Sequence, residues 1–140
     1  SITMTDATTN GCHGGLKIYD FPAGNILILG AVTDLAITAG AGGITDTAAV
    51  VGSIGSVVVA NTNETLTSTE ANIVPSTAST LTGGVGTTDG ESTAVAILDG
   101  TATAVDAYLN FAVPDAGSSA NDTLAVSGTI TITWVNLGDN

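Results

Sequence analysis

The sequence has almost no positive charge. It contains one lysine, Lys17, and no arginine against 13 acidic residues, so its formal net charge is −12. Proteins that bind nucleic acids or anionic membranes neutralise phosphate groups with Lys and Arg side chains. We therefore predict that neither nucleic acid nor a membrane surface is a direct partner of this chain.

Side chains that carry chemistry are also scarce. Cys12 and His13 are the only cysteine and the only histidine, so no intrachain disulfide can form. Adjacent side chains of an extended chain point to opposite faces, which prevents this pair from sharing a metal ion or acting as nucleophile and base. We predict no catalytic residue, no metal site and no cofactor, and we expect the protein not to be an enzyme.

Long apolar runs are absent. The longest apolar stretch, residues 26–29 continuing into 30–32, falls far short of the roughly 18 residues of a membrane-spanning helix. Residues 1–10 contain no basic residue followed by an apolar run. We therefore expect neither a membrane span nor a signal peptide.

What the sequence has in abundance is β-branched residues in alternating patterns, which predict strands. Along residues 123–134, apolar side chains ending at Trp134 alternate with Thr, Ser and Ala. A second alternating segment, residues 104–113, contains Phe111 and is followed by a polar loop at 114–119. We predict that these two segments pair and that Phe111 and Trp134 share one core.

Further strands are expected on either side of the turn at residues 21–24. One contains Leu16 and Ile18, and another begins at Asn25 and changes parity near Thr33 and Asp34, which predicts a bulge there. Weaker strands are expected at residues 48–51, 57–60 and 92–98, and flexible segments at 39–43 and 76–88.

Taken together, these patterns predict an all-β protein. We expect seven or eight strands in an antiparallel two-sheet β-sandwich, jelly-roll-like, that forms a single domain over residues 1–140 with an extended N-terminal arm at 1–12. Thr67 and Glu70 have the spacing of a capping box, which leaves open whether residues 68–74 form a short helical turn or a polar loop.

Carboxylates are the only abundant ionisable groups, and calcium is the metal ion that they would bind. Asp99, Asp115 and Asp122 lie in expected loops, but no loop has EF-hand spacing, so a solvated acidic surface is the favoured interpretation. Lys17 alternates with apolar neighbours, which favours a solvated strand residue over a contact to a partner's carboxylate. The glycosylation triplets at 63–65 and 121–123 are expected to be accidental in a Thr-rich chain.

Four segments resemble a group of small structural proteins of tailed phages. They are HGGLKIYDFPAG at 13–24, IVPSTA at 73–78, DGTATA at 99–104 and GTITITW at 128–134. The resemblance implies a component of the virion, and a small acidic all-β protein of that kind is similar to capsid decoration, or cement, proteins.

This resemblance implies a homotrimer on the exterior of the capsid that contacts the major capsid protein and stabilises the shell. Two other functions stay open. One is a host- or glycan-binding head of a fibre or spike, against which the few aromatic residues count. The other is the subunit of an extracellular filament, for which residues 1–10 offer a donor strand or arm.

Overall fold

The computed structural model describes residues 1–60 and 65–139, and within them the chain is all-β. The strands are β1 (Ile2–Asp6), β2 (Cys12–Asp20), β3 (Gly24–Ala39), β4 (Ala49–Gly55), β5 (Val74–Thr80), β6 (Val85–Glu91), β7 (Ala96–Gly100), β8 (Asp106–Val113) and β9 (Asp122–Asn136). The described residues contain no α-helix, only two 3-10 turns at Ser68–Glu70 and Asp115–Gly117. The expected all-β class is confirmed.

The nine strands form one hydrogen-bonded sheet in the order β5-β4-β8-β2-β1-β9-β3-β6, with β7 on the same edge of β3 as β6. Every strand pair is antiparallel, as expected. The sheet is longest where β3 meets β9, because these strands stay paired from Ile26 opposite Asn136 to Ala39 opposite Leu124.

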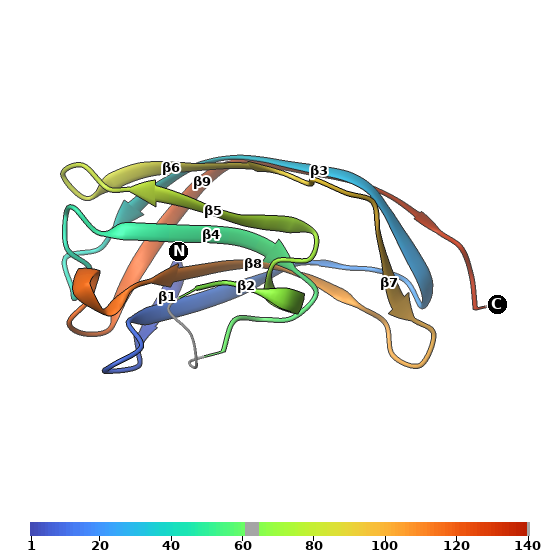
Figure 1. The fold of residues 1–140 in the computed structure, drawn as a ribbon, viewed down its shortest axis with the longest axis horizontal. Helices are drawn as coiled ribbons and strands as arrows, with labels where there is room; N and C mark the ends of the chain where they lie inside the picture. Colours follow the sequence, from blue (N-terminus) through green and yellow to red (C-terminus); the bar gives the residue numbers. More distant parts are fainter. Residues whose placement is uncertain (61–64, 140) are drawn as a thin grey trace.

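The sheet curves back over its own core, so that β5 and β6, at the two ends of the strand order, lie close together. A Cβ atom on Gly90 of β6 would lie 2.9 Å from Val74 of β5, and one on Gly86 would lie 3.0 Å from the Ser79 hydroxyl. In Figure 1, β3, β6 and β9 arch over β4, β8 and β2. Glycine at these positions allows the close approach that encloses the core.

The core is aliphatic, as the composition predicts. Its largest fully buried side chains are Phe21, Phe111, Met4, Ile26, Ile28, Ile37, Ile54, Leu66, Leu81, Leu124, Val50 and Val74. Nine of them lie in β1, β3, β4, β5, β8 and β9. The other three, Phe21, Leu66 and Leu81, lie in connections between strands. Packing of such side chains is the main stabilising contribution in a fold with no disulfide bond among its described residues.

The predicted pairing of the segments around Phe111 and Trp134 is wrong. β8 lies between β4 and β2, whereas β9 lies between β1 and β3, so the loop after Val113 crosses from one side of the core to the other. Phe111 is fully buried, and Trp134 packs half-buried against the same core cluster beside Tyr19 and Phe21, at ring-centroid distances of 5.9 and 5.4 Å. The two side chains therefore share a core without sharing a strand pair.

The bulge predicted near Thr33 and Asp34 exists but lies earlier in β3. The register with β9 shifts between Ile28 and Gly30, and the buried positions of β3 change parity at the same place. Val32, which a parity change at Thr33 and Asp34 would have placed in the core, is consequently exposed, and Thr33 points inward. Because Val32 and Thr33 are both β-branched, alternation alone does not distinguish these two registers.

Two other segments differ from the sequence prediction. Residues 57–60 form no strand, because the Asn110 side chain accepts a hydrogen bond from Val59 N–H and donates one to the Val57 carbonyl, both at 2.9 Å. Much of residues 76–88, expected to be flexible, forms β5 and β6. The predicted capping box is present, but the helical turn that it caps is short. The Glu70 carboxylate accepts a hydrogen bond from Thr67 N–H at 3.4 Å, and the turn is a single 3-10 turn at Ser68–Glu70.

Truncation of the two aromatic side chains should separate their roles. We expect Phe111→Ala to lower the free energy of unfolding by about 3–5 kcal/mol, because it leaves a cavity in a fully enclosed site. Trp134→Ala should cost less, because its half-buried site is open to solvent on one side. Urea unfolding of both variants measures this order, and an equal or larger loss at Trp134 would contradict it.

Candidate functional site

An apolar patch covers the outer face of β3, β7 and β9, on the side of the sheet away from the core. We call it the outer apolar patch. It comprises the half-buried Leu27 with the exposed Leu29, Ile97 and Val135 of these strands, and the exposed residues that flank β7 and β9, Val95 and Leu137. Ile97 and Val95 are the most exposed large apolar residues described, with 64% and 61% of their surface accessible. Apolar clusters of this kind on a protein surface mark sites of interaction.

Strand pairing brings these side chains together. Leu27 of β3 is the direct cross-strand partner of Ile97 on one side and of Val135 on the other. Leu29 lies in the bulge of β3, and Leu137 continues from β9 through a hydrogen bond from its N–H to the Asn25 carbonyl. The patch therefore combines residues that are about 110 positions apart in the sequence. In Figure 1, β7 lies beside β3 on the right.

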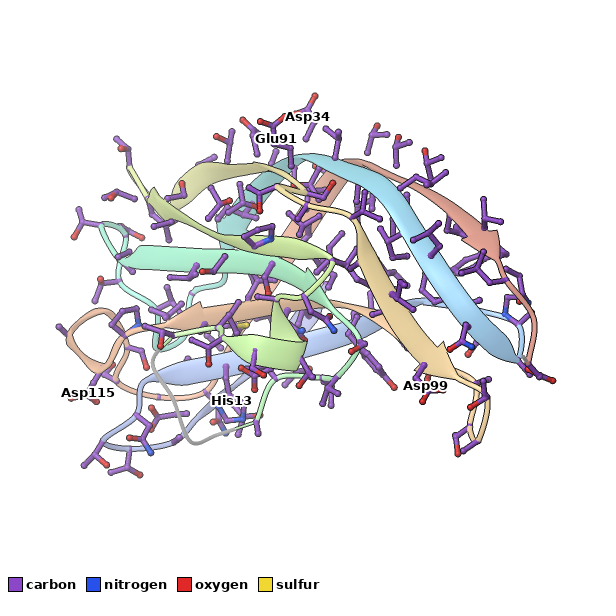
Figure 2. The ribbon with its side chains drawn as sticks, turned by 45° about the vertical axis from the view of Figure 1, so that its right-hand side comes forward. His13, Asp34, Glu91, Asp99 and Asp115 are labelled. Atoms are coloured by element: carbon purple, nitrogen blue, oxygen red, sulfur yellow. The ribbon has the colours of Figure 1, made fainter. Side chains whose placement is uncertain are left out.

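Acidic side chains lie on the same outer face beyond the patch. Asp34 of β3 is directly opposite Asp89 of β6, and Glu91 is opposite Val32. Figure 2 shows Asp34 and Glu91 projecting from this face into solvent. Like charges at facing positions repel, and they would also repel a second copy of the chain. A contact made by the patch must therefore work against charge.

A second apolar surface is a cleft between β2 and β9. Its wider part, of about 250 Å³, begins at Ser1 and Ile2 and is lined by Leu16, Val126 and Ile130, with Leu35 and Leu109 beneath. Ile130 also lines the adjoining part, of about 190 Å³, with Ile18, Ile132, Tyr19 and Trp134. We call the two parts the β2/β9 cleft.

Cys12 and His13 point to opposite sides of β2, as expected, and make no joint site. Cys12 is buried, accepts a hydrogen bond from the Ser118 hydroxyl at 2.8 Å and donates one to the Ala120 carbonyl at 3.2 Å. Burial raises the pKa of its thiol, which keeps it in the unreactive protonated form. Among the described residues, His13 Nδ1 has no hydrogen-bond partner.

The three aspartates weighed as calcium ligands do not converge. Asp99 and Asp115 lie at opposite ends of the molecule in Figure 2. Asp99 accepts hydrogen bonds from the Thr101 hydroxyl at 2.7 Å and the Thr101 N–H at 3.1 Å, and these lower its pKa. No group of three or more acidic, His or Cys side chains within residues 1–60 and 65–139 is placed to hold a metal ion.

Asp122 has a structural role instead. Its buried carboxylate accepts hydrogen bonds from the N–H groups of Gly42 at 3.2 Å, Ile44 at 2.9 Å and Thr123 at 2.7 Å. The glycine-rich segment is tightly packed here, because a Cβ on Gly43 would lie 2.1 Å from the Ala120 carbonyl oxygen. Asp122 thus fixes the segment that was expected to be flexible.

Lys17 is exposed on β2, as expected, and its charge is compensated within the chain. Its amine contacts Asp20 at 2.5 Å and Asp106 at 3.4 Å, and the Asp20 contact holds the Lys17 pKa above and the Asp20 pKa below their usual values. Asp106 also accepts a hydrogen bond from the Tyr108 hydroxyl at 2.9 Å, which raises the Tyr108 pKa. Such exposed pairs contribute little to stability.

Neither glycosylation triplet indicates a functional site. The triplet at 63–65 begins outside the described residues. In the triplet at 121–123, the Asn121 side chain accepts a hydrogen bond from Asp6 N–H at 2.7 Å and the Asp122 side chain is buried. Both groups therefore have structural roles at the end of β1.

No family model, no curated protein and no solved structure matches this chain. Within the described part of the chain, no helix is long and apolar enough to cross a membrane. The outer apolar patch and the β2/β9 cleft both present apolar side chains that a partner could cover.

The role of Asp122 can be tested directly. We expect Asp122→Ala to lower the free energy of unfolding by about 1–3 kcal/mol, because it leaves the buried N–H of Ile44 without an acceptor. The control is Asp99→Ala, which removes an exposed turn contact and should change stability by less than about 0.5 kcal/mol. Thermal melting with EDTA or calcium should give equal midpoints, and stabilisation by calcium that Asp122→Ala abolishes would contradict this assignment.

Proposed function

We propose that this protein is a non-enzymatic structural subunit that associates with copies of itself, as a capsid decoration protein of a tailed phage does. The observation that carries the proposal is the outer apolar patch, in which Ile97 of β7 and the preceding Val95 are more than half exposed. The proposal places the protein on the outside of the particle, as a homotrimer that contacts the major capsid protein.

Burial of the patch supports association. Removing apolar surface from water is favourable by roughly 25 cal/mol per Å², so side chains such as Leu29, Ile97 and Val135 gain stability once a second surface covers them. The opposing contribution is the charge of −12 on each copy. Salt screens this repulsion, with a screening length of about 10 Å at 0.1 M and about 3 Å at 1 M.

The same charge suits a position outside a genome container, because a strongly acidic surface does not adhere to nucleic acid and keeps particles dispersed. We also propose that the curved sheet is best described as a two-layer sandwich, with β5, β4, β8 and β2 in one layer, β9, β3, β6 and β7 in the other, and β1 shared. A shape of this kind presents a broad outer face to a partner.

A filament subunit is the second candidate, and a separate observation favours it. The N-terminal strand β1 fits between β2 and β9, the site that a donor strand from a neighbouring subunit would fill. A glycan-binding head has less support, because Phe21 is buried and Trp134 half-buried, which leaves Tyr19 as the exposed ring of this aromatic cluster.

The decisive experiment measures the mass of the assembly by light scattering across a salt series. We expect a closed oligomer that strengthens as salt rises, because apolar contact works against repulsion. Ile97→Thr should weaken association by roughly tenfold, since it removes about 1–2 kcal/mol of apolar burial per contact. Val85→Thr is the matched control, because Val85 is half-exposed but lies outside the patch.

A monomer at all salt concentrations, or association that disappears at high salt, would contradict the proposal. Electron microscopy of the assembled protein then distinguishes the candidates, because closed oligomers support a decoration protein and open-ended growth supports a filament subunit. Strong binding on a glycan array without self-association would favour the fibre head.

A further inference from the structure

The N-terminal strand β1 occupies a slot in the middle of the sheet. Thr5 and Asp6 pair with β2, whereas Ile2 to Met4 pair with β9. Ile2 and Met4 point into the core, where 3% and 0% of their surface is accessible. β1 therefore completes the core although it contributes only five residues to the sheet.

Gly14 of β2 makes room for this strand. A Cβ atom at Gly14 would lie 2.3 Å from the Thr3 carbonyl oxygen and 2.9 Å from the Met4 sulfur atom. Gly14 does not have a positive φ angle, so the requirement is for space and not for backbone conformation. The slot is shaped for an inserted strand.

The slot is also longer than the strand inside it. β2 continues to Asp20 and β9 to Asn136, but among the described residues their facing edges pair with β1 only at Cys12–His13 and at 122–124. The β2/β9 cleft occupies the remaining length and leaves Leu16 half-exposed. Unpaired strand edges beside apolar side chains are a site for an added strand.

The connection that folds β1 back onto its own chain is strained. Thr8 has a φ of 63°, a left-handed conformation that β-branched residues rarely adopt. The turn is tight, with a hydrogen bond from Ala7 N–H to the Gly11 carbonyl at 2.8 Å. An extended connection would release this strain, and short strained hinges favour the exchange of strands between copies.

We propose that the slot between β2 and β9 accepts the N-terminal strand of a second copy of this chain, so that copies are joined by exchange of β1. The occupant is identified by fit, because β1 itself supplies the alternation of buried Ile2 and Met4 with exposed Thr3 and Thr5 that the slot requires. Exchange re-forms the same contacts between two chains, and it releases the backbone strain of the left-handed conformation at Thr8.

Exchange of β1 does not depend on the outer apolar patch, because β1 contributes none of its residues. It is separate from assembly through the patch and deepens the filament candidate, because it identifies β1 as the strand that physically links one copy to the next. Ile97→Thr tests association through the patch, whereas the disulfide trap described below tests exchange of β1. Either test can give a negative result without the other, so the two proposals are distinguishable.

A disulfide trap tests the exchange. Thr3 and Thr123 are cross-strand partners and both are exposed. Facing Cα atoms lie about 4.5–5.5 Å apart, within the range that a disulfide spans. The trap variant carries Thr3→Cys and Thr123→Cys, and Cys12→Ser removes the native thiol. This protein is refolded at high concentration, oxidised and analysed on a denaturing gel without reductant. Exchange gives covalently linked chains, whereas a strand kept in its own chain gives only monomers.

The matched control is Thr38→Cys with Ala125→Cys, an exposed partner pair of β3 and β9 that does not involve β1. This pair should give monomers under the same conditions. Linked chains in the β1 pair alone support exchange, and their absence, or an equal amount in the control, overturns it. Circular dichroism confirms that both variants are folded before oxidation.

The hinge provides a second prediction. Thr8→Gly removes the steric cost of the left-handed conformation, so it stabilises the closed chain relative to the exchanged one. That cost, about 1–2 kcal/mol, corresponds to roughly five- to thirtyfold fewer linked chains in the disulfide trap. Thr9→Gly is the control, because Thr9 does not have a positive φ angle. An unchanged yield in Thr8→Gly would contradict the role of hinge strain.

Discussion

Pairing through β1 is the interaction on which the closure of this fold depends. In the described residues, β1 is the only strand that hydrogen-bonds both to the group β5-β4-β8-β2 and to the group β9-β3-β6. Without it, the remaining strands would enclose the core only by side-chain contact and by the close approach of β5 and β6. Ile2 and Met4 thus contribute both to the core and to the continuity of the sheet. Closure of the fold is therefore sensitive to local opening of a strand of only five residues.

The sequence predicts the strands whose two faces differ in polarity and misses those whose faces are alike. Residues 123–134 alternate clearly and form most of β9, whereas β5 and β6 consist largely of Thr, Ser and Gly, a composition shared with loops. The pairing of β8 with β9 was expected from their adjacency in the chain, but adjacency does not say whether a polar loop turns within a layer or crosses the core. The position of the β3 bulge was ambiguous because neighbouring β-branched side chains satisfy either register.

The candidate surfaces were less predictable than the strands. The opposite directions of Cys12 and His13 follow from strand geometry alone, and they were correctly expected. The outer apolar patch joins residues of β3, β7 and β9 whose alignment depends on register, and the β2/β9 cleft has walls more than 100 residues apart. Asp122 shows the same limit. In the sequence its carboxylate resembles a metal ligand in a loop, but in the structure it accepts hydrogen bonds from the N–H groups of Gly42 and Ile44, which are 80 and 78 residues away. Only the folded chain reveals which polar groups are already satisfied.

The single cation has a practical consequence. Because the chain has one lysine and no arginine, trypsin can cut it at one bond only, between Lys17 and Ile18. That bond lies within β2, where Lys17 is opposite Tyr108 of β8. Proteases need a locally opened segment, so the intact sheet protects this bond. Cleavage would detach residues 1–17, which include all of β1. The rate of one proteolytic cut therefore reports how often β2 opens around Lys17, at the position where it pairs with β8.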